Sequence, residues 1–358
     1  MSTIRVLHVI ARMNVGGTAR YVGDLVENLP NSALATGYVQ GAEIEDPVVS
    51  TIDPYRILHL GRKVSPINDF RAWVELRRLI GEMEPDVIHT HTFKAGLIGR
   101  LVRGNHKRVH TFHGHLFDDQ SFSSLQKKVI TWAEQYLAKR TDYFISVGEK
   151  VGEEIRSAGI GRNKVWASIA PGVSKLPLLD KLEARKKLGL DSQVFLVGWM
   201  ARMTSVKNPR LLLDVARILP EVQFVMAGGG DLLDQIRLDA PNNVRVIGWA
   251  DSSAFWSAVD LAVSTSDNEG MPIALIEAQL AGVPVVATDV GSNSEVIANG
   301  ITGLVTDKNM KSLSIGLQSI ISNPTQLTSM AMAAQGFAAK KFSSQEMLNA
   351  HLNIYRQL

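Results

Sequence analysis

Short apolar segments rich in β-branched residues alternate along the whole chain with segments in which apolar residues recur at helical spacing. In the first half, the pattern predicts strands at residues 6–10, 87–90, 109–112 and 143–147, and helices at residues 70–82 and 125–139. The same rhythm then predicts strands at residues 194–199, 222–227, 244–247, 261–264 and 283–287, and helices at residues 209–219, 272–281 and 313–321. Parallel sheets covered by helices produce this alternation. The sequence therefore predicts an α/β protein with two Rossmann-like, doubly wound units.

The strand rhythm is lost between Pro171 and Leu190, where a proline-containing and charged segment intervenes. We place the boundary at its start, which gives a first domain of residues 1–172 and a second of residues 173–342. Residues 343–358 form an amphipathic pattern and are predicted to be a helix that crosses back to the first domain. Ligands of such sheets bind beyond the carboxyl ends of the strands, so we expect the two domains to face a cleft.

Composition narrows the class of protein. The chain has 358 residues, of which 45% are hydrophobic and 20% charged, and it contains no cysteine. These values exclude a disordered or disulfide-stapled chain, a thiolate nucleophile and a cysteine-ligated metal. A formal net charge of +3 is too small to indicate nucleic-acid binding. The amino terminus has one short apolar run, too little for a secretory signal or a membrane span, so we expect a cytoplasmic protein.

Charge and histidine content differ between the halves. Residues 1–170 contain 22 Lys and Arg against 18 Asp and Glu, whereas the remaining residues contain 16 against 17. Eight of the nine histidines also lie in the first part. This asymmetry predicts that each half holds a different partner.

A pair of glycines, Gly16 and Gly17, directly follows the first predicted strand and opens a predicted helix. Tandem glycines let backbone N–H groups approach an anion at the positive end of a helix, so this loop could receive a phosphate or a sugar. A tight strand-to-helix turn explains the glycines equally well. The spacing matches neither the dinucleotide fingerprint nor the P-loop, which argues against a nicotinamide dehydrogenase.

Histidines gather where two predicted strands end. His89 and His91 end one strand, and the segment from His110 to His115 ends another. Histidine suits proton transfer or polar contact near neutral pH, and strand ends are where a doubly wound sheet presents reactive groups. A metal site ranks below a polar substrate pocket, because no HExxH motif and no cysteine are present. His106 and His110 fit a structural role best.

Two basic residues, Arg202 and Lys207, follow the first predicted strand of the second half. Cations that converge from one strand-to-helix loop can neutralise a diphosphate and stabilise charge on a departing one. Solvated surface cations are the plainer explanation, but the position at a strand's carboxyl end favours the diphosphate.

The most specific segment runs from Ser264 to Ala278. It predicts a strand end, a turn at residues 269–272 and a helix with a proline near its start, whose free N–H groups could face a ligand. Glu277 is predicted two helical turns beyond Glu269. A carboxylate at Glu277 could accept both hydroxyls of a ribose, and Glu269 could contact sugar hydroxyls. Carboxylates so close to a phosphate site argue against a purely phosphate ligand.

The segment EGMPIALIEA, with two acidic residues separated by seven others, resembles the E-x7-E motif of the retaining glycosyltransferases of family four, which have the GT-B fold. The NVGG loop, the HTFHGH strand end, the pair Arg202 and Lys207, and the segment GVPVVATDVGSNSEVI occur in that family's order, so the resemblance covers nearly the whole chain. Two positions depart from the family's pattern: Ala201 precedes Arg202 where the family has Gly, and Asn208 follows Lys207 where the family has Gly. These changes affect the expected shape of the loop more than its charge.

The resemblance implies a role for each site residue. Arg202 and Lys207 would hold the donor diphosphate, Glu277 the ribose, and Glu269 the transferred sugar, with help from the backbone amides of Gly270, Met271, Pro272 and Ile273 as a segment. Gly16 and Gly17 would approach the donor phosphate or the acceptor. His113 would contact the donor sugar near its reacting centre, with His115 as its rival and His91 as a further contact to sugar or acceptor. The family implies no cofactor and no metal.

The resemblance implies a hexosyltransferase that needs no metal and retains the configuration of the sugar. The donor would be a nucleotide-sugar, most often a UDP-sugar in this family. The acceptor would be a glycan or polyprenyl-linked molecule in surface polysaccharide synthesis. Basic residues of the first domain would suit an anionic membrane, which predicts peripheral association with the inner face of the cell membrane: Arg100, Arg103, Lys107, Arg108, Lys127, Lys128, Lys139 and Arg140. Two alternatives stay open, a UDP-sugar 2-epimerase-like enzyme with the same fold and a non-catalytic glycan- or nucleotide-binding partner.

Overall fold

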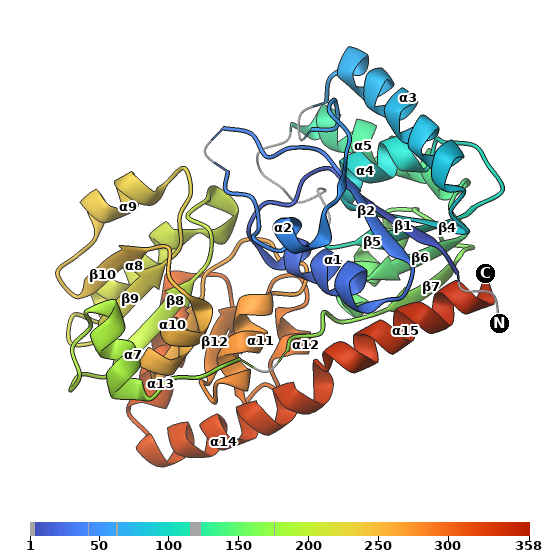
Figure 1. Ribbon diagram of the computed structural model, residues 1–358. Coiled ribbons are helices and arrows are strands. Elements are labelled where there is room, and N and C mark those ends of the chain that lie inside the picture. Colours follow the sequence, from blue (N-terminus) through green and yellow to red (C-terminus); the bar gives the residue numbers. More distant parts are fainter. Residues whose placement is uncertain (1–3, 42, 62–63, 115–122, 175) are drawn as a thin grey trace. The chain divides into compact units, whose positions relative to one another are not determined.

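The computed structural model describes residues 4–358 except 42, 62–63, 115–122 and 175. The chain divides into two compact units (Figure 1). The first comprises Met1–Gly172 together with Ser344–Leu358, and the second comprises Val173–Ser343. The last helix of the chain therefore belongs to the first unit.

The first unit is built on a parallel sheet whose strands follow the order β3-β2-β1-β4-β5-β6-β7. Its described strands are β1 (Val6–Ile10), β2 (Ser32–Thr36), β3 (Tyr55–Arg56), β4 (Val87–His91), β5 (Lys107–Phe112), β6 (Tyr143–Ser146) and β7 (Val165–Ser168). Its helices are α1 (Gly17–Asn28), α2 (Val49–Ile52), α3 (Pro66–Met83), α4 (Thr92–Gly99), α5 (Ser124–Ala138), α6 (Glu149–Ser157) and α15 (Ser344–Gln357).

The second unit contains a parallel sheet in the order β10-β9-β8-β11-β12-β13. Its strands are β8 (Leu196–Met200), β9 (Gln223–Ala227), β10 (Val244–Gly248), β11 (Leu261–Ser264), β12 (Val285–Thr288) and β13 (Gly303–Thr306). Its helices are α7 (Lys181–Leu188), the 3₁₀ turn η1 (Ser205–Lys207), α8 (Pro209–Ile218), α9 (Leu233–Asp239), α10 (Ser252–Ala258), α11 (Ile273–Leu280), α12 (Asn293–Val296), α13 (Met310–Ile321) and α14 (Pro324–Lys341).

The predicted strands are confirmed, each within two residues at its ends. Parallel strands covered on both faces read as continuous apolar runs, and β1, β4 and β11 are buried throughout. The pattern missed β2, β3, β7 and β13. These strands are short or lie toward the edges of their sheets, and β2, with the sequence SALAT, lacks the β-branched run that marks the others.

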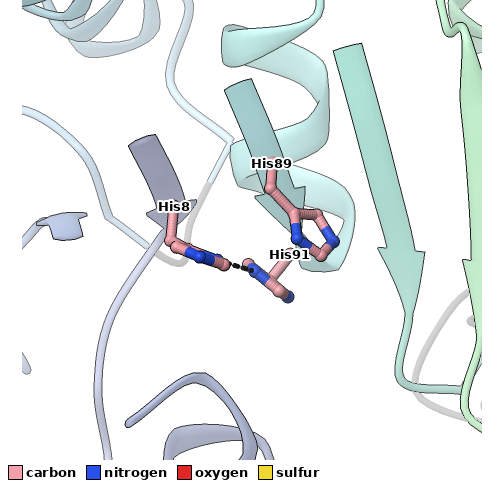
Figure 2. Close-up of side chains that lie close together, drawn as sticks. All are labelled: His8, His89 and His91. Carbon is pink, nitrogen blue, oxygen red and sulfur yellow. Dashed lines mark hydrogen bonds between the residues drawn. The ribbon is translucent and has the colours of Figure 1, made fainter. Parts of the chain in front are cut away.

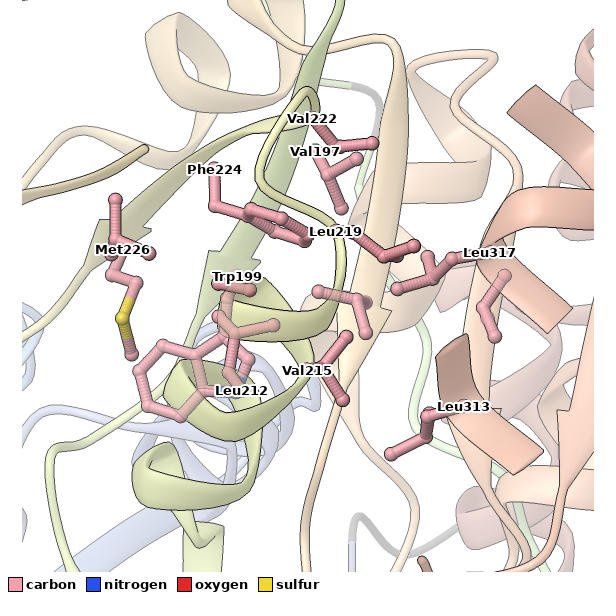
Figure 3. Packing of buried hydrophobic residues seen from close by; sticks show 14 of the residues in the cluster. Val197, Trp199, Leu212, Val215, Leu219, Val222, Phe224, Met226, Leu313 and Leu317 are labelled. Carbon is pink, nitrogen blue, oxygen red and sulfur yellow. The ribbon is translucent and has the colours of Figure 1, made fainter. Parts of the chain in front are cut away.

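The core of the second unit lies between the sheet and α8 and α13. Apolar side chains from β8 and β9 meet Leu212, Val215 and Leu219 of the α8 segment, while Leu313 and Leu317 of α13 close the cluster (Figure 3). All of these side chains are buried. Full burial stabilises the fold by about 1.5–3 kcal/mol for each such side chain. This core holds rigidly the strand ends from which the candidate site projects.

The helix α15 packs onto the first unit through one apolar stripe. Met347, Leu348, His351, Ile354 and Tyr355 are buried at spacings of one helical turn. The sulfur of Met347 accepts a hydrogen bond from the backbone N–H of Gly172 at 3.0 Å. The last residues of the chain thus complete the unit that its first residues begin.

Candidate active site

Each sheet has a point at which its strand order reverses, between β1 and β4 in the first unit and between β8 and β11 in the second. Crevices outside the carboxyl ends of strands at such a point bind ligands in open α/β sheets. The predicted site residues of the second unit follow β8 and β11, and the histidines lie on β1, on β4 and just after β5. The topology therefore places the predicted residues where this fold holds its ligands.

In the second unit the structure joins Lys207 to Glu269. The ammonium of Lys207 donates to Glu269 Oε1 at 2.6 Å, and the hydroxyl of Ser266 donates to the same oxygen at 2.7 Å. The Glu269 side chain is 9% exposed and that of Lys207 19%. Because the pair is largely withdrawn from water, its attraction is stronger than that of a surface ion pair. Two residues 62 positions apart in sequence are thus brought into contact.

The loop that carries Lys207 is held by Asn208. This residue has a φ of 45°, a left-handed conformation that favours Gly or Asn, and its Oδ1 accepts from the backbone N–H of Leu211 to cap α8. The hydroxyl of Thr265 donates to the carbonyl oxygens of Lys207 and Asn208 at 3.1 and 2.9 Å. Asn208 therefore supplies the backbone shape that a glycine would supply in the family's pattern. Arg202 lies half-buried on the same loop, two residues beyond β8.

Only one of the two candidate glutamates lies on a helix. The prediction that Glu277 follows Glu269 by two helical turns is wrong, because α11 begins at Ile273 and Glu269 lies in the preceding loop. Glu277 is 3% exposed, and its Oε2 accepts a hydrogen bond from the indole of Trp256 at 3.4 Å. Gly270 and Met271 are half-buried, while Pro272 and Ile273 are buried. No side chain caps the start of α11.

Gly291 fixes the backbone of Glu269 from the neighbouring loop. Its φ is 49°, and a Cβ built at this position would lie 1.9 Å from the carbonyl oxygen of Glu269. The carbonyl of Gly270 also accepts from the backbone N–H of Ser292 at 2.9 Å. The segment GVPVVATDVGSNSEVI thus contributes a close backbone contact that positions Glu269.

In the first unit Gly16 is the residue before α1 and Gly17 is its first residue. Gly16 has a φ of 150°, which a residue with a Cβ rarely adopts. No side chain caps this helix start. The glycine pair therefore makes a strand-to-helix connection whose backbone stays uncovered by a capping side chain.

The histidines form one hydrogen-bonded chain. His8 Nδ1 lies 3.1 Å from His91 Nε2 (Figure 2), and His91 Nδ1 lies 3.1 Å from His113 Nε2. Both ring nitrogens of His91 therefore face other histidines. His91 is fully buried, whereas His113 is half-buried. The edge of Tyr21 packs against His113 at a centroid distance of 4.8 Å. His115 lies outside the described residues.

Burial explains why these rings stay neutral. Burial, together with the charge on a protonated His351, lowers the pKa of His8 to about 3 and that of His113 to about 3. The pKa of His91 is also lowered well below its usual range by burial and by its histidine neighbours. A neutral imidazole can donate one hydrogen bond and accept another. The row of hydrogen-bonded histidines is therefore suited to orienting protons rather than to carrying charge.

Sequence reasoning missed four members of this cluster, namely His8, Tyr21, His351 and Tyr355. His351 Nε2 is hydrogen bonded to the hydroxyl of Tyr21 at 3.0 Å, and the hydroxyl of Tyr355 is hydrogen bonded to His89 Nδ1 at 2.6 Å. His351 and Tyr355 are separated by one turn of α15, a spacing that marks one helix face. Only the fold shows which strands that face meets. His110, expected to be structural, is buried and bonded to the hydroxyl of Thr90 at 2.8 Å.

His8, His89 and His91 also have ring nitrogens within 4.8 Å of one another, close enough to consider a metal ion. The rings of His8 and His91, however, lie end to end in nearly one plane, with centroids 5.4 Å apart and an interplanar angle of 19° (Figure 2). Their nitrogens point at each other, as in a hydrogen bond, and both nitrogens of His89 already bond to hydroxyls. The arrangement is that of a hydrogen-bond network and not of three ligands that converge on one point.

The basic residues of the first unit differ in their exposure. Arg100, expected among the cations of a membrane surface, is fully buried, and its guanidinium donates to both carboxylate oxygens of Glu134 at 2.7 and 2.8 Å. That expectation is therefore wrong for Arg100. Lys128 and Lys139 are exposed. Within the described ranges, no helix combines the length and the apolar character that crossing a bilayer requires.

Two parallel-sheet α/β units, each with a switch point in its strand order, are the architecture of the GT-B fold. Family comparison agrees: residues 180–337 match the model of Glycosyl transferases group 1, and residues 16–167 match that of the Glycosyl transferase 4-like domain. The chain belongs to this glycosyltransferase family, which confirms the predicted family and fold.

The curated relatives include two bacterial glycosyltransferases that act in glycan synthesis. An Escherichia coli UDP-Gal:alpha-D-GlcNAc-diphosphoundecaprenol alpha-1,3-galactosyltransferase is 26% identical over 335 residues, which cover 86% of this chain and 85% of the relative. An O-antigen biosynthesis glycosyltransferase, also of Escherichia coli, is 25% identical over 284 residues, covering 77% and 79%.

Among solved structures, the HepE protein of Anabaena in complex with UDP and glucose superposes with a TM-score of 0.83 at 20% identity, covering 99% of this chain and 100% of that chain. Sucrose-phosphate synthase of Thermosynechococcus elongatus superposes with a TM-score of 0.83 at 17% identity, covering 99% and 98%. These likenesses establish the shared fold.

Proposed function

We propose that this glycosyltransferase moves a hexose from a UDP-sugar to a glycan or polyprenyl-linked acceptor, with retention of configuration and without a metal or cofactor. The observation that carries the proposal is the contact between Lys207 and Glu269 beyond β8 and β11. A cation for a diphosphate and a carboxylate for sugar hydroxyls stand side by side there, as a nucleotide-sugar requires.

The donor groups divide the nucleotide-sugar among them. Arg202 and Lys207 hold the diphosphate, and the carboxylate of buried Glu277 accepts hydrogen bonds from the ribose hydroxyls. Glu269 accepts hydrogen bonds from hydroxyls of the transferred sugar. The backbone N–H groups of Gly270, Met271 and Ile273 donate to the phosphates, while Pro272, which has no N–H, shapes the segment. Because Lys207 shares its charge with Glu269, the carboxylate is tolerated beside a diphosphate. From the first unit, His113 contacts the sugar, and Gly16 and Gly17 approach the phosphate or the acceptor.

The reaction proceeds by displacement on the face of the leaving group. The acceptor oxygen forms a bond to the anomeric carbon while the bond from that carbon to the diphosphate oxygen breaks. The acceptor's proton passes to the departing diphosphate oxygen, so no side chain has to act as base. Arg202, Lys207 and the amides stabilise the negative charge that develops on the diphosphate.

Relatives support the acceptor class. The Escherichia coli relative's name specifies a diphosphoundecaprenol-linked acceptor and UDP-Gal as donor, and a second relative serves O-antigen synthesis. An acceptor of this kind lies in a membrane, so we propose that the enzyme works peripherally at the cytoplasmic face of the cell membrane. The modest net charge gives no reason to expect a nucleic-acid partner.

A donor screen and two variants test the proposal. A ligand that binds only the folded state raises the melting temperature, so UDP should stabilise the protein more than GDP, ADP or CMP. Lys207→Ala and Glu277→Ala should each reduce kcat/KM about a hundredfold. Lys187→Ala, an exposed lysine of the same unit, is the matched control. Unchanged kinetics in both site variants would overturn the donor assignment.

Product analysis separates the alternatives. Transfer yields a larger product, with an axial or equatorial anomeric bond that matches the donor's, and turnover should survive EDTA. An epimerised nucleotide-sugar of unchanged mass would establish the epimerase, and UDP binding without turnover a binding partner. His113→Ala should abolish transfer with the fold retained. If only His115→Ala did so, the histidine would be misassigned.

A further inference from the structure

The outer side of α5 carries a stripe of exposed apolar side chains. Leu125, Val129, Trp132 and Tyr136 follow one another at intervals of four, three and four residues, which places them on one helix face. Their exposed fractions run from 43% to 72%. Soluble proteins rarely expose a contiguous set of large apolar side chains unless something binds them.

Within the described segment from residue 123 to residue 140, the exposed charges beside this stripe have one sign. Lys127 and Lys128 lie within α5, and Lys139 and Arg140 follow its end. The only acidic residue of α5 is Glu134, which is buried and paired with Arg100. The exposed part of the helix therefore presents apolar and positively charged groups together. The guanidinium of Arg140 lies 5.3 Å from the ring centroid of Tyr136, so charge and stripe are in direct contact.

A second set of apolar side chains lies on α3, which like α5 packs against α4 (Figure 1). Ile67, Phe70 and Val74 are exposed and share one helix face, with Arg71 and Arg78 exposed beside them. The carboxylates of α3 are engaged locally: Asp69 with Lys94, Glu75 with His59, and Glu82 with Arg78. Two helices on one side of the first unit thus share the same character.

We propose that the α5 stripe inserts into the surface of an anionic phospholipid bilayer. The helix has 15 residues and so lies in the interface rather than spanning it. Trp132 and Tyr136, stacked at a centroid distance of 6.2 Å, sit at headgroup depth as such rings do, while the basic residues attract anionic headgroups. Charge complementarity selects this occupant over a neutral apolar one. The inference rests on the proposed membrane-borne acceptor and names the surface that reaches it.

Vesicle binding tests the surface. The full chain should sediment with vesicles of phosphatidylglycerol and phosphatidylcholine but only weakly with phosphatidylcholine alone, and salt should reduce binding. The pairs Val129→Ser with Trp132→Ser, and Lys128→Glu with Lys139→Glu, should each weaken binding about tenfold or more. The control pair is Leu238→Ser with Met332→Ser, which removes apolar side chains of the second unit that are even more exposed. Tryptophan emission should shift to the blue on binding, but not in Trp132→Phe.

Each result of these measurements either supports or overturns the proposed membrane surface. UDP stabilisation and transfer to a water-soluble acceptor should survive in all these pairs. Their absence from the unaltered protein would count against the proposed function and not against the surface. Absence of binding to anionic vesicles, or equal binding by the α5 pairs, overturns the proposal. A concentration-dependent dimer that Val129→Ser with Trp132→Ser abolishes, without vesicle binding, would make a second copy the occupant and also overturn it.

The histidine chain carries a second inference. His8 Nε2 is buried and has no hydrogen-bond partner among the described residues. Protons can be ordered along the chain in two directions, and one of them places an N–H at this unpartnered nitrogen. Buried N–H groups without an acceptor are rarer in proteins than unfilled acceptors. The favoured order therefore has His8 Nδ1–H donating to His91 Nε2 and His91 Nδ1–H donating to His113 Nε2.

We infer that His8 and His91 are positioning residues that keep the proton of His113 on Nδ1. His113 then serves the proposed transfer as a neutral hydrogen-bond donor. The ¹⁵N chemical shifts of the His113 ring report this tautomer directly. His8→Asn, whose amide can donate from the place of Nδ1, should keep both the tautomer and kcat. His8→Leu should mix the tautomers and lower kcat about tenfold with the KM for UDP-sugar unchanged.

A folding defect in one variant would not be mistaken for the positioning role, because the tautomer is also measured in the unaltered protein. Equal losses in His8→Asn and His8→Leu, or a His113 ring protonated on Nε2 in the unaltered protein, would overturn the positioning role. If His113→Ala alone had no effect on transfer, the failure would lie in the proposed function, because the tautomer is measured without substrate.

Discussion

Gly291 shows how one residue can govern a site that it does not enter. A methyl group at this position would overlap the carbonyl oxygen of Glu269. We expect Gly291→Ala to displace Glu269 and to reduce kcat/KM at least tenfold, since small shifts in a positioned group are costly. The measurement is steady-state kinetics alongside circular dichroism.

Gly300→Ala is the matched control for this prediction. Gly300 also has a positive φ, 80°, but a Cβ there has open space around it. Both variants suffer the backbone penalty, of order 1 kcal/mol, and only Gly291→Ala also meets the carbonyl. Equal activity in the two variants would show that the close contact does not position Glu269.

The buried histidines make stability depend on pH. Burial lowers the pKa of His8 to about 3 and that of His351 to about 4, while the value in an unfolded chain is near 6.5. Between these values the unfolded chain binds more protons, so the free energy of unfolding is full above pH 6.5 and falls as the pH drops. The expected slope is about 1.4 kcal/mol per pH unit for each histidine.

Urea unfolding at pH 7.5, 6 and 5 measures this slope. His351→Gln removes one of the titrating groups and should flatten the dependence, although it also lowers stability at pH 7.5. A free energy of unfolding that stays constant between pH 7.5 and 5 would contradict the neutral, buried state of the cluster.

At the scale of elements, the strands and their ends could be predicted from sequence because burial on both sheet faces leaves a continuous apolar run. The residues after β8 and β11 could then be assigned to one sheet edge. The turn at residues 269–272 could also be predicted, but the helical spacing assigned to Glu269 and Glu277 is wrong, because α11 begins only at Ile273 and Glu269 lies in the loop before it. The pairing of Lys207 with Glu269 could not be predicted, because it depends on which strands are neighbours.

Changes in the helix α15 should destabilise the first unit, whose other residues lie far from α15 in sequence. Tyr355 is buried and bonded to His89, so Tyr355→Ala leaves a cavity and an unpaired ring nitrogen. We expect it to destabilise the first unit by about 3–5 kcal/mol, and Tyr355→Phe by about 1 kcal/mol. Thermal unfolding measures both. Tyr55→Ala, at an exposed position, should cost far less, and a similar loss there would contradict the reason given.

At the scale of the whole molecule, the described donor groups Arg202, Lys207, Glu269 and Glu277 all belong to the second unit, and the histidine network to the first. Hydrogen exchange should therefore report UDP locally. We expect slower exchange in residues 203–211 and 265–277 when UDP is added, since bound ligand suppresses local opening. Amides of residues 344–357 should exchange at unchanged rates. Protection confined to the first unit would contradict the donor assignment.

The histidine network also marks the limit of sequence reasoning for the whole chain. The strand ends that carry His91 and His113 could be predicted, but Tyr21, His351 and Tyr355 meet them from α1 and α15. Residues more than 300 positions apart in sequence form one of these contacts. Such a contact depends on the sheet order and on the return of the last helix, neither of which a local pattern encodes.

That return has a consequence for how the protein is made. A chain emerges from the ribosome from its amino terminus, so residues 1–172 are made before α15. The hydroxyl of Tyr21 and Nδ1 of His89 find their hydrogen-bond partners only after α15 has been synthesised. The second unit is contiguous and can finish folding earlier. The unit whose residues are synthesised first therefore finishes folding last. A nascent chain that is released before α15 has been made leaves the surface that α15 covers exposed.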